Sequence, residues 1–263
     1  FSGCSNLKNI DLPDGLEKIG KMAFLSSVNA RIYIPQSVTD IEKKAFNDNA
    51  VIYGYANSAA EEFAKNNDIK FVAVNSHDEY LSLLTYSDTD NSSYKSAIDE
   101  LSQLGIINGF EDGTFKPQDN VTRAQAATMF ATALGYSDTK YQNIATDKAV
   151  FSDFLMSHWA YKYADYVMKS ADISSGETNC ILSGFEDGTF RPDNNVTIIQ
   201  LLKMAICSLG EDGYMAEAVE NGGYPNGYNT VAGKYGFSKS IAVDDINQPA
   251  TREQTAQIIS NTI

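Results

Sequence analysis

The spacing of apolar residues along the chain changes from one pattern to another. In residues 1–54, short apolar stretches punctuated by Pro recur every 22 residues. Farther along, apolar side chains follow one another at helical intervals, as at Ala97, Ile98 and Leu101. The first pattern predicts brief strands that stack on one another, and the second predicts amphipathic helices. We therefore expect an α+β chain in two parts.

The 22-residue unit carries the same phrase twice. Leu12-Pro13 corresponds to Ile34-Pro35, and Ala23-Phe24 corresponds to Ala45-Phe46. A unit of this size cannot bury its own apolar face, so neighbouring units must stack. The opening Phe-Ser-Gly-Cys looks like the end of an earlier copy, so we expect the chain to be a piece of a longer protein.

The phrase from Ile34 to Phe46 resembles the BspA-type leucine-rich repeats, in which IP-x-x-V-x-x-I-x-x-x-A-F recurs. The resemblance covers about residues 1–74 and implies the end of a solenoid, whose surface would meet protein or host-surface partners. Ser58 with Glu61 forms a capping-box pattern. We expect a short helix there, running to about Asn66 and closing the solenoid.

A larger repeat follows. Residues 108–122 read NGFEDGTFKPQDNVT and residues 183–197 read SGFEDGTFRPDNNVT, with eleven of fifteen positions identical. An aromatic-Ser-Asp motif precedes each copy and ends at Asp88 and Asp153. A third, diverged copy shows most clearly in its final helix, within residues 250–263.

Each large copy predicts a helix, a tight loop and a second helix. Asp-Gly within the loop marks a turn. Gln three residues after Thr marks a capping box, and this pattern recurs at Thr122, Thr197 and Thr251. We therefore expect three equivalent helix N-termini. The aromatic residues of the two loops are expected in the core: Phe110, Phe115, Phe185 and Phe190.

G-F-x-D-G-T-F-x-P followed by T-R-A-Q resembles the S-layer homology (SLH) domain, a family in which three tandem copies are usual. The resemblance covers residues 86–263, with copies at about 86–136, 149–210 and 211–263 and a linker at 75–85. It implies an all-α pseudo-threefold bundle of helix-loop-helix repeats. In the family, the grooves of this bundle bind a secondary cell-wall polysaccharide that typically carries ketal-linked pyruvate on N-acetylmannosamine.

The resemblance also implies a set of glycan-binding residues. The main one is the Arg directly after the capping Thr, which is Arg123 in the first copy and Arg252 in the third. An Arg beside the free N–H groups of a helix N-terminus would suit a carboxylate. The second copy has Ile198 there, which predicts a weakened or silent groove. The remaining candidates are Asp88, Asp153, Tyr94, Trp159, Asp112, Gly113, Asp187, Gly188 and Arg191.

Several of these residues also have a structural interpretation. Arg123 could join two repeats through an ion pair. Asp88 and Asp153 could cap helices, since Asp is a common N-cap residue. Trp159 could be a core residue or a platform for a sugar ring. The sequence leaves these alternatives open.

Composition and charge narrow the function. With 20 Lys and Arg against 34 Asp and Glu, the net charge is −14, and no basic cluster suits nucleic acid. No apolar run is long enough for membrane insertion. The three cysteines are widely spaced and odd in number, so we expect free thiols, without a zinc site.

Other classes of function are disfavoured by the motifs. The two histidines lie in no catalytic pattern, so we expect neither an enzyme nor a cofactor. The GFEDGTF loop lacks the alternating acidic ligands of a calcium-binding EF-hand. We expect a secreted, non-catalytic protein held on the cell wall of a Gram-positive bacterium, displaying its leucine-rich repeats for adhesion. The alternative is a degenerate SLH module that acts only as a scaffold for protein contacts.

Overall fold

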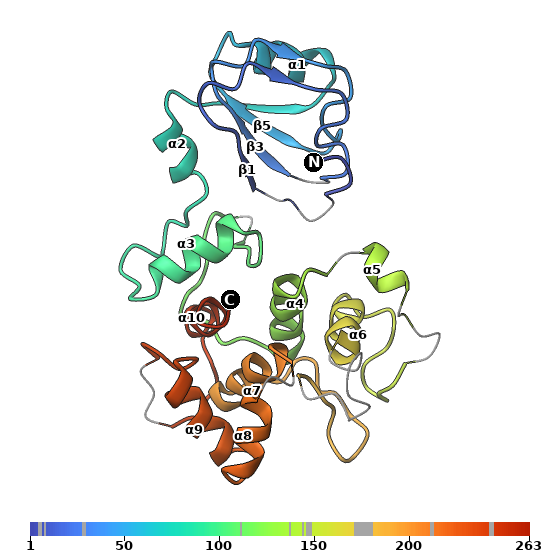
Figure 1. Ribbon diagram of the computed structural model, residues 1–263, viewed down its shortest axis with the longest axis vertical. Coiled ribbons are helices and arrows are strands. Elements are labelled where there is room, and N and C mark those ends of the chain that lie inside the picture. The colour runs from blue at the N-terminus through green and yellow to red at the C-terminus, as the bar shows by residue number, and fades with distance from the viewer. Residues whose placement is uncertain are drawn as a thin grey trace. The chain divides into compact units, whose positions relative to one another are not determined.

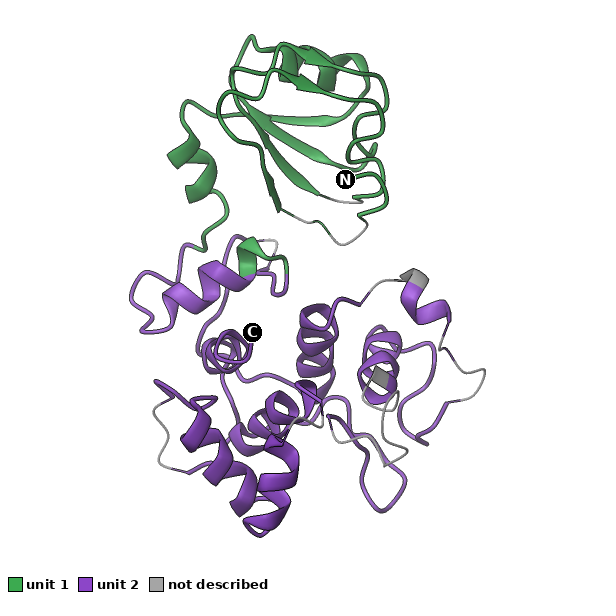
Figure 2. Ribbon diagram, in the orientation of Figure 1, with its two compact units in different colours: residues 1–86, 102–105 green, residues 87–101, 106–263 purple. Residues whose placement is uncertain are grey.

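In the computed structural model, the chain folds into two compact units, and each is described by itself (Figure 2). The first comprises residues 1–86 with 102–105, and the second comprises residues 87–101 with 106–263. The first contains parallel strands and the second is mainly helical, so the expected α+β class is confirmed. The structure describes residues 1–4, 7, 9–27, 30–110, 112–136, 138–143, 145, 149–170, 181–210, 213–241 and 245–263.

The first unit is a stack of parallel strands (Figure 1). One sheet has the order β1-β3-β5-β6, and a second pairs β2 with β4. Asn9 pairs with Arg31 and Lys18 pairs with Asp40, so the offset between neighbouring strands is the 22-residue repeat of the sequence. The strands are β1 (Asn9–Asp11), β2 (Lys18–Ile19), β3 (Arg31–Ile34), β4 (Asp40–Ile41), β5 (Val51–Gly54) and β6 (Lys70–Ala73).

Stacked phenylalanines form the spine of this unit. The Phe24 and Phe46 rings are stacked with centroids 5.7 Å apart, and Phe46 meets Phe63 edge to face at 5.7 Å. Phe63 belongs to α1 (Ala59–Asn66), whose N-cap Ser58 accepts a hydrogen bond from the N–H of Glu61. The predicted capping helix is confirmed, and it buries the end of the aromatic stack.

The opposite face of the sheet carries a second apolar cluster. Successive side chains of a strand point to opposite faces, so Tyr33 lies on the face away from Ile32. Tyr80 of α2 (His77–Ser82) is fully buried there, with its ring centroid 5.0 Å from that of Tyr33 and 5.2 Å from that of Tyr53. These helical residues fall within the segment 75–85, which we expected to be a linker. That expectation is wrong for them, because a buried ring fixes them to the sheet.

The second unit is built from helices joined by loops. Helices α4, α7 and α10 begin with the predicted capping boxes at Thr122, Thr197 and Thr251, and α10 packs against both α4 and α7. In the described part of the chain, no helix has the length and apolar character needed to cross a membrane. The helices are α3 (Lys95–Gln103), α4 (Arg123–Ala133), α5 (Asp138–Gln142), α6 (Tyr161–Ser170), α7 (Ile198–Ser208), α8 (Tyr214–Glu220), α9 (Asn226–Tyr235) and α10 (Arg252–Ser260).

A closed ring of backbone hydrogen bonds joins the segments that lead into α4, α7 and α10. The N–H of Val121 donates to the carbonyl of Ala250 at 3.0 Å, Ala250 donates to Val196 at 2.9 Å, and Val196 donates to Val121 at 2.9 Å. All three residues are buried. Each one directly precedes a capping Thr, so the three joined segments have equivalent positions before their helices.

The cysteines differ from the sequence expectation. Cys207 of α7 is disulfide-bonded, whereas Cys4 is a free and exposed thiol. The expectation of free thiols is therefore wrong for Cys207, because wide spacing in sequence says nothing about proximity in the fold. Cys180 lies outside the described residues.

The aromatic stack predicts where the first unit is most sensitive to mutation. Phe46 is 1% exposed, and replacing it with Ala should lower the free energy of unfolding of this unit by about 3–5 kcal/mol because a cavity is left in the stack. Phe1 stacks on Phe24 but is 74% exposed, so Phe1→Ala should cost less than about 1 kcal/mol. Hydrogen exchange of the strand amides measures both. Equal losses would contradict the role given to the buried rings.

Candidate functional site

The two GFEDGTF loops adopt the same conformation. In the second loop, the N–H of Phe185 donates to the carbonyl of Thr189 at 2.8 Å, and the N–H of Gly188 donates to that of Phe185 at 3.0 Å. The equivalent bonds of the first loop have the same lengths. Gly113 and Gly188 have φ angles of 80° and 78°, a conformation that disfavours any residue with a Cβ. Both candidate glycines therefore shape the turn.

The Asp of each loop holds the turn closed. Asp187 Oδ1 accepts bonds from the N–H of Thr189 at 3.0 Å and from its hydroxyl at 2.6 Å, while Oδ2 accepts one from Arg191 at 2.7 Å. The hydroxyl and then the guanidinium lower the pKa of Asp187 to about 2. Asp112 makes the same two bonds to Thr114. The charge of Arg191 is thus paired within its own loop.

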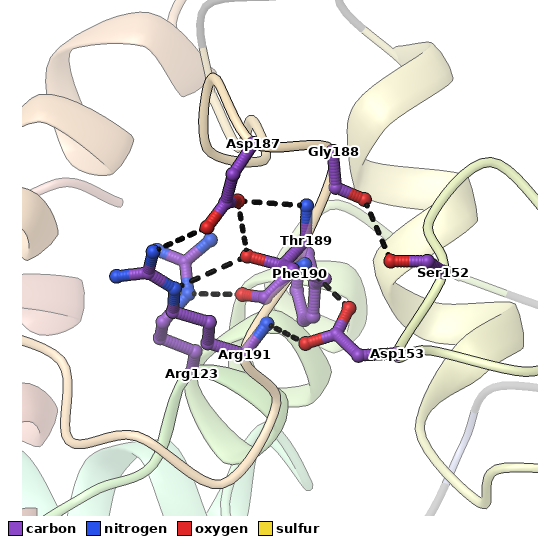
Figure 3. Close-up of polar contacts among 8 residues, drawn as sticks. All are labelled: Arg123, Ser152, Asp153, Asp187, Gly188, Thr189, Phe190 and Arg191. Atoms are coloured by element: carbon purple, nitrogen blue, oxygen red, sulfur yellow. Dashed lines mark hydrogen bonds and ion pairs between the residues drawn. The ribbon is translucent and has the colours of Figure 1, made fainter.

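The upstream Asp residues clamp the loops from the other side. Figure 3 shows Asp153 facing the backbone N–H groups of Phe190 and Arg191, with bonds of 2.7 and 2.8 Å. Asp88 accepts the equivalent pair in the first copy, both at 2.8 Å. Desolvation raises the pKa of Asp153, but the two N–H donors outweigh it, so this pKa lies below its usual value. These carboxylates tie loop to upstream segment, a role that differs from the expected helix cap.

Arg123 reaches from α4 into the loop of the second copy. Its side chain is buried, with Nε donating to the Phe190 carbonyl and Nη2 to the Ser183 carbonyl, each at 2.8 Å. The guanidinium carbon lies 4.8 Å from the ring centroids of Phe185 and Phe190. Burial and then the positive charge of Arg191 lower the pKa of Arg123 to about 10, so it stays charged at neutral pH.

Arg252 repeats this arrangement between α10 and the first loop. It is buried, and it donates from Nε to the Phe115 carbonyl at 2.7 Å and from Nη2 to the Asn108 carbonyl at 3.0 Å. Its guanidinium also lies over the rings of Phe110 and Phe115. Both arginines therefore hold the loop of another copy. The structural interpretation from the sequence is corrected in one respect, because the partners of these bonds are carbonyl groups rather than a carboxylate.

The helix N-termini are also occupied by carbonyl groups. In α4, the N–H of Arg123 donates to Asn194 and that of Ala124 to Pro192, at 2.9 and 3.0 Å, while the next is taken by the Thr122 hydroxyl. Helices α7 and α10 make the equivalent bonds to another copy at 2.8–3.2 Å. The expectation that these helices offer unpaired N–H groups to a carboxylate is wrong, because neighbouring loops already take them.

A cavity of about 620 Å³ opens beside Arg123. One wall is the second loop, another is α7, and Tyr224 comes from the turn before α9. Burial lowers the pKa of Lys203 below its usual value, and the charge of Arg123 adds to this. Arg123 and Lys203, which come from different copies, therefore share one cavity with the paired Arg191. Its lining includes Arg123, Ser183, Phe185, Gln200, Lys203 and Tyr224.

The aromatic candidates lie elsewhere. Tyr94 is buried, and Trp159 is 57% exposed beside His158; neither lines the cavity. The core interpretation of Trp159 is therefore wrong, and its contact with a glycan stays a prediction. Phe110 is 40% exposed and Phe185 is partly exposed, so both were wrongly expected to be core residues. The other two loop phenylalanines are fully buried, as predicted.

Sequence reasoning missed Lys203, Gln200 and Tyr224. Gln200 was interpreted only as part of a capping box, which it is. A signal for Lys203 is present, because it is the one charged residue within the apolar helix IIQLLKMAICS. Tyr224 lies in the part of the third copy that has diverged most, so no motif marks it. Among the described residues, no group of three His, Cys, Asp or Glu side chains could hold a metal ion.

Models of two protein families match the chain. The S-layer homology domain matches residues 85–127 and 150–197, and the BspA-type leucine-rich repeat region matches residues 1–91. The chain joins BspA-type leucine-rich repeats to SLH domains. The SLH matches contain Asp88 and Arg123 in the first copy and Asp153 with the clamped loop in the second, so the bonds from Arg123 to the second loop lie within the matched residues. Residues 211–263 lie outside both matches.

Several surface proteins contain similar sequence. Cell surface glycoprotein 1 of Acetivibrio thermocellus is 40% identical over 91 residues, which are 35% of this chain and 3% of that protein. The cellulosome-anchoring protein of the same organism is 36% identical over 92 residues, 35% of this chain and 18% of that protein. The middle cell wall protein of Brevibacillus brevis is 26% identical over 166 residues, 63% of this chain and 14% of that protein. The chain thus spans less than a fifth of each of these relatives.

The buried arginine predicts a large effect on the stability of the SLH unit. Arg123→Met removes two charge-assisted hydrogen bonds and leaves two carbonyls without donors, which should cost about 3–5 kcal/mol in total. Arg191→Met is the matched control, because it removes an ion pair between two exposed side chains and should cost much less. Urea unfolding followed by Trp159 fluorescence compares the two. Similar losses would show that the Arg123 clamp contributes little.

The loop carboxylates predict acid sensitivity. The pKa values of Asp153 and Asp187 are lowered in the folded state, so the stability they contribute is complete above the unfolded value of about 3.9 and is lost as the pH falls towards 2. The melting temperature of the SLH unit should therefore fall between about pH 4.5 and 2. Asp153→Asn should flatten this dependence, whereas Asp193→Asn, an exposed control in the same loop, should not. Equal slopes in both variants would contradict the assignment.

Proposed function

We propose that the SLH domains hold this chain on the bacterial cell surface by binding a secondary cell-wall polymer, and that the chain itself performs no catalysis. The family matches support the surface location, as do relatives whose names describe cell-surface, cell-wall and anchoring proteins. The observation that carries the binding proposal is the cavity beside Arg123. Besides Arg191, which is paired with Asp187, its lining combines the cations Arg123 and Lys203 with an amide and two aromatic rings, on a chain whose net charge is −14.

The chemistry of this cavity suits an acidic sugar. Its volume lies in the usual range for small-molecule sites, about 300–1,000 Å³. A pyruvate ketal adds one carboxylate to a sugar that is otherwise neutral, and the cations Arg123 and Lys203 complement such a group. The amide of Gln200 and the ring of Tyr224 match the hydroxyls and apolar faces of a sugar. Cationic charge confined to a cavity allows an acidic protein to bind an acidic polymer.

We further infer that residues 211–263 are a third, diverged SLH copy and that the three copies form a pseudo-threefold unit. The closed ring of backbone bonds supports this, because each copy contributes one residue directly before a capping Thr. Arg252 supports it too, since it clamps the first loop in the way that Arg123 clamps the second. On this proposal, the arginines form the groove wall and supply charge, and the ligand does not displace their bonds to the carbonyls.

The leucine-rich repeats are proposed to meet protein or host-surface partners. Their exposed side chains and stacked architecture are typical of repeat proteins that bind other proteins. A second candidate function, a scaffold without glycan binding, is favoured for one groove alone. Ile198 stands where the other copies have Arg, so that interface has no cation at the clamp position.

Cosedimentation with cell walls tests the anchoring proposal. The 263-residue chain should pellet with Gram-positive sacculi that keep their secondary polymer and should stay in solution with sacculi from which acid extraction has removed it. A third preparation keeps the polymer but has lost its pyruvate ketals. Retention on it should fall, and the size of the fall measures how much the ketal carboxylates contribute to binding. Equal retention on all three preparations would contradict polymer binding, and retention on none would contradict anchoring.

A further inference from the structure

Helix α7 carries a positive charge where the equivalent helices are neutral. Lys203 lies six residues after its capping Thr, and the same offset gives Thr128 in α4 and Gln257 in α10. The two neutral side chains bond within their own helices, Thr128 to the Ala124 carbonyl at 3.0 Å and Gln257 to Asn261 at 2.8 Å. Lys203 lines the cavity instead. One of three equivalent positions has thus become cationic.

The surroundings of Lys203 leave its charge available to a ligand. It is partly buried, its ammonium lies 6.0 Å from the ring centroid of Tyr224, and no described carboxylate forms an ion pair with it. Two acidic side chains also line the cavity, but Asp187 is paired with Arg191, and Glu186 is exposed. A partly desolvated ammonium without a counter-ion is unfavourable, so a bound carboxylate would relieve this cost.

The clamp position and the Lys203 position together rank the three interfaces by charge. The cavity at the second loop has Arg123 from α4 and Lys203 from α7. At the first loop, the corresponding residues are Arg252 and Thr128, and at the third they are Ile198 and Gln257. At these two positions the interface at the second loop has two cations, that at the first loop has one, and that at the third has none. A bound carboxylate is therefore stabilised most at the second loop.

We propose that Lys203 makes the groove at the second loop the carboxylate-selective site of this chain, with the acidic group of the wall glycan bound between Lys203 and Arg123. Lys203 is then the residue that discriminates an acidic sugar from its neutral counterpart. The other two interfaces hold the copies together and bind an acidic sugar far more weakly. This assignment rests on the proposed function, since it names the ligand class and the discriminating residue of the same groove.

Calorimetric titration of the whole chain tests the assignment with two probes. The acidic probe is methyl N-acetylmannosaminide carrying a 4,6-pyruvate ketal, and the neutral probe is the same glycoside without the ketal. The parent chain should bind one equivalent of the acidic probe, at least about tenfold more tightly than the neutral one, as expected of a charge-assisted bond. Lys203→Gln introduces the residue that α10 already has at this position. It should weaken acidic-probe binding at least about tenfold and leave neutral-probe binding within about twofold.

Two further variants control for charge and folding. Lys203→Arg keeps the cation and should retain acidic-probe affinity within about threefold, while Lys203→Thr, which introduces the residue found at this position in α4, should behave as Lys203→Gln does. Lys239→Gln removes the same net charge from an exposed site and should change neither affinity. Trp159 fluorescence and far-UV circular dichroism establish that each variant is folded.

The outcomes separate this inference from the proposed function. If Lys203→Gln binds the acidic probe as tightly as the parent chain does while the parent pellets with polymer-bearing sacculi, the role of Lys203 is overturned and anchoring stands. Binding of two or three equivalents with similar affinities overturns the single selective groove. If the parent neither binds the acidic probe nor pellets with any sacculi, both proposals fail.

Discussion

An α-helix leaves its first N–H groups without partners inside the helix, and the second unit satisfies them from segments that are distant in the sequence. In α4, α7 and α10, the first two N–H groups donate to carbonyls of a different copy, and the capping Thr accepts the next. Donors and acceptors follow one another around the ring formed by Val121, Val196 and Ala250. No copy completes its own helix start. The arginine clamps and the cavity depend on this exchange, because each is built from more than one segment of the chain.

The exchange also explains how charge is distributed in an acidic chain. Asp153 and Asp187 accept hydrogen bonds from the second loop, one on each side of it, and Asp187 also pairs with Arg191. Arg123 neutralises no carboxylate, because its bonds go to carbonyl oxygens. Its positive charge therefore remains at the interface, where the charge of Lys203 adds to it. Positive charge is therefore concentrated in one cavity of a chain whose net charge is −14.

Local features of the fold were predictable from the sequence, and features that require two distant segments were not. The capping boxes and the helix at Ser58 follow from residues three apart, and the 22-residue period appears directly as strand register. T-R-A-Q marks the start of a helix but says nothing of the loop that packs over it. The position of Arg123 in the first turn of the helix was therefore predicted correctly, but the carbonyl groups that it binds were not. Tyr80 and Tyr224 become important only through packing against segments far away in sequence, and neither lies in a repeated phrase.

The clamp between the last helix and the first loop has a mechanical consequence. Arg252 and the N–H groups that open α10 hold the carbonyls of Asn108, Phe115, Pro117 and Asp119, which follow soon after the chain enters this unit. Tension arriving from the N-terminal side therefore reaches the C-terminal helix directly, instead of travelling through the copies in series. The hydrogen bonds that join the three segments of the ring would then bear the load at the same time and would have to break together. Such an attachment resists being peeled from its N-terminal end one copy at a time.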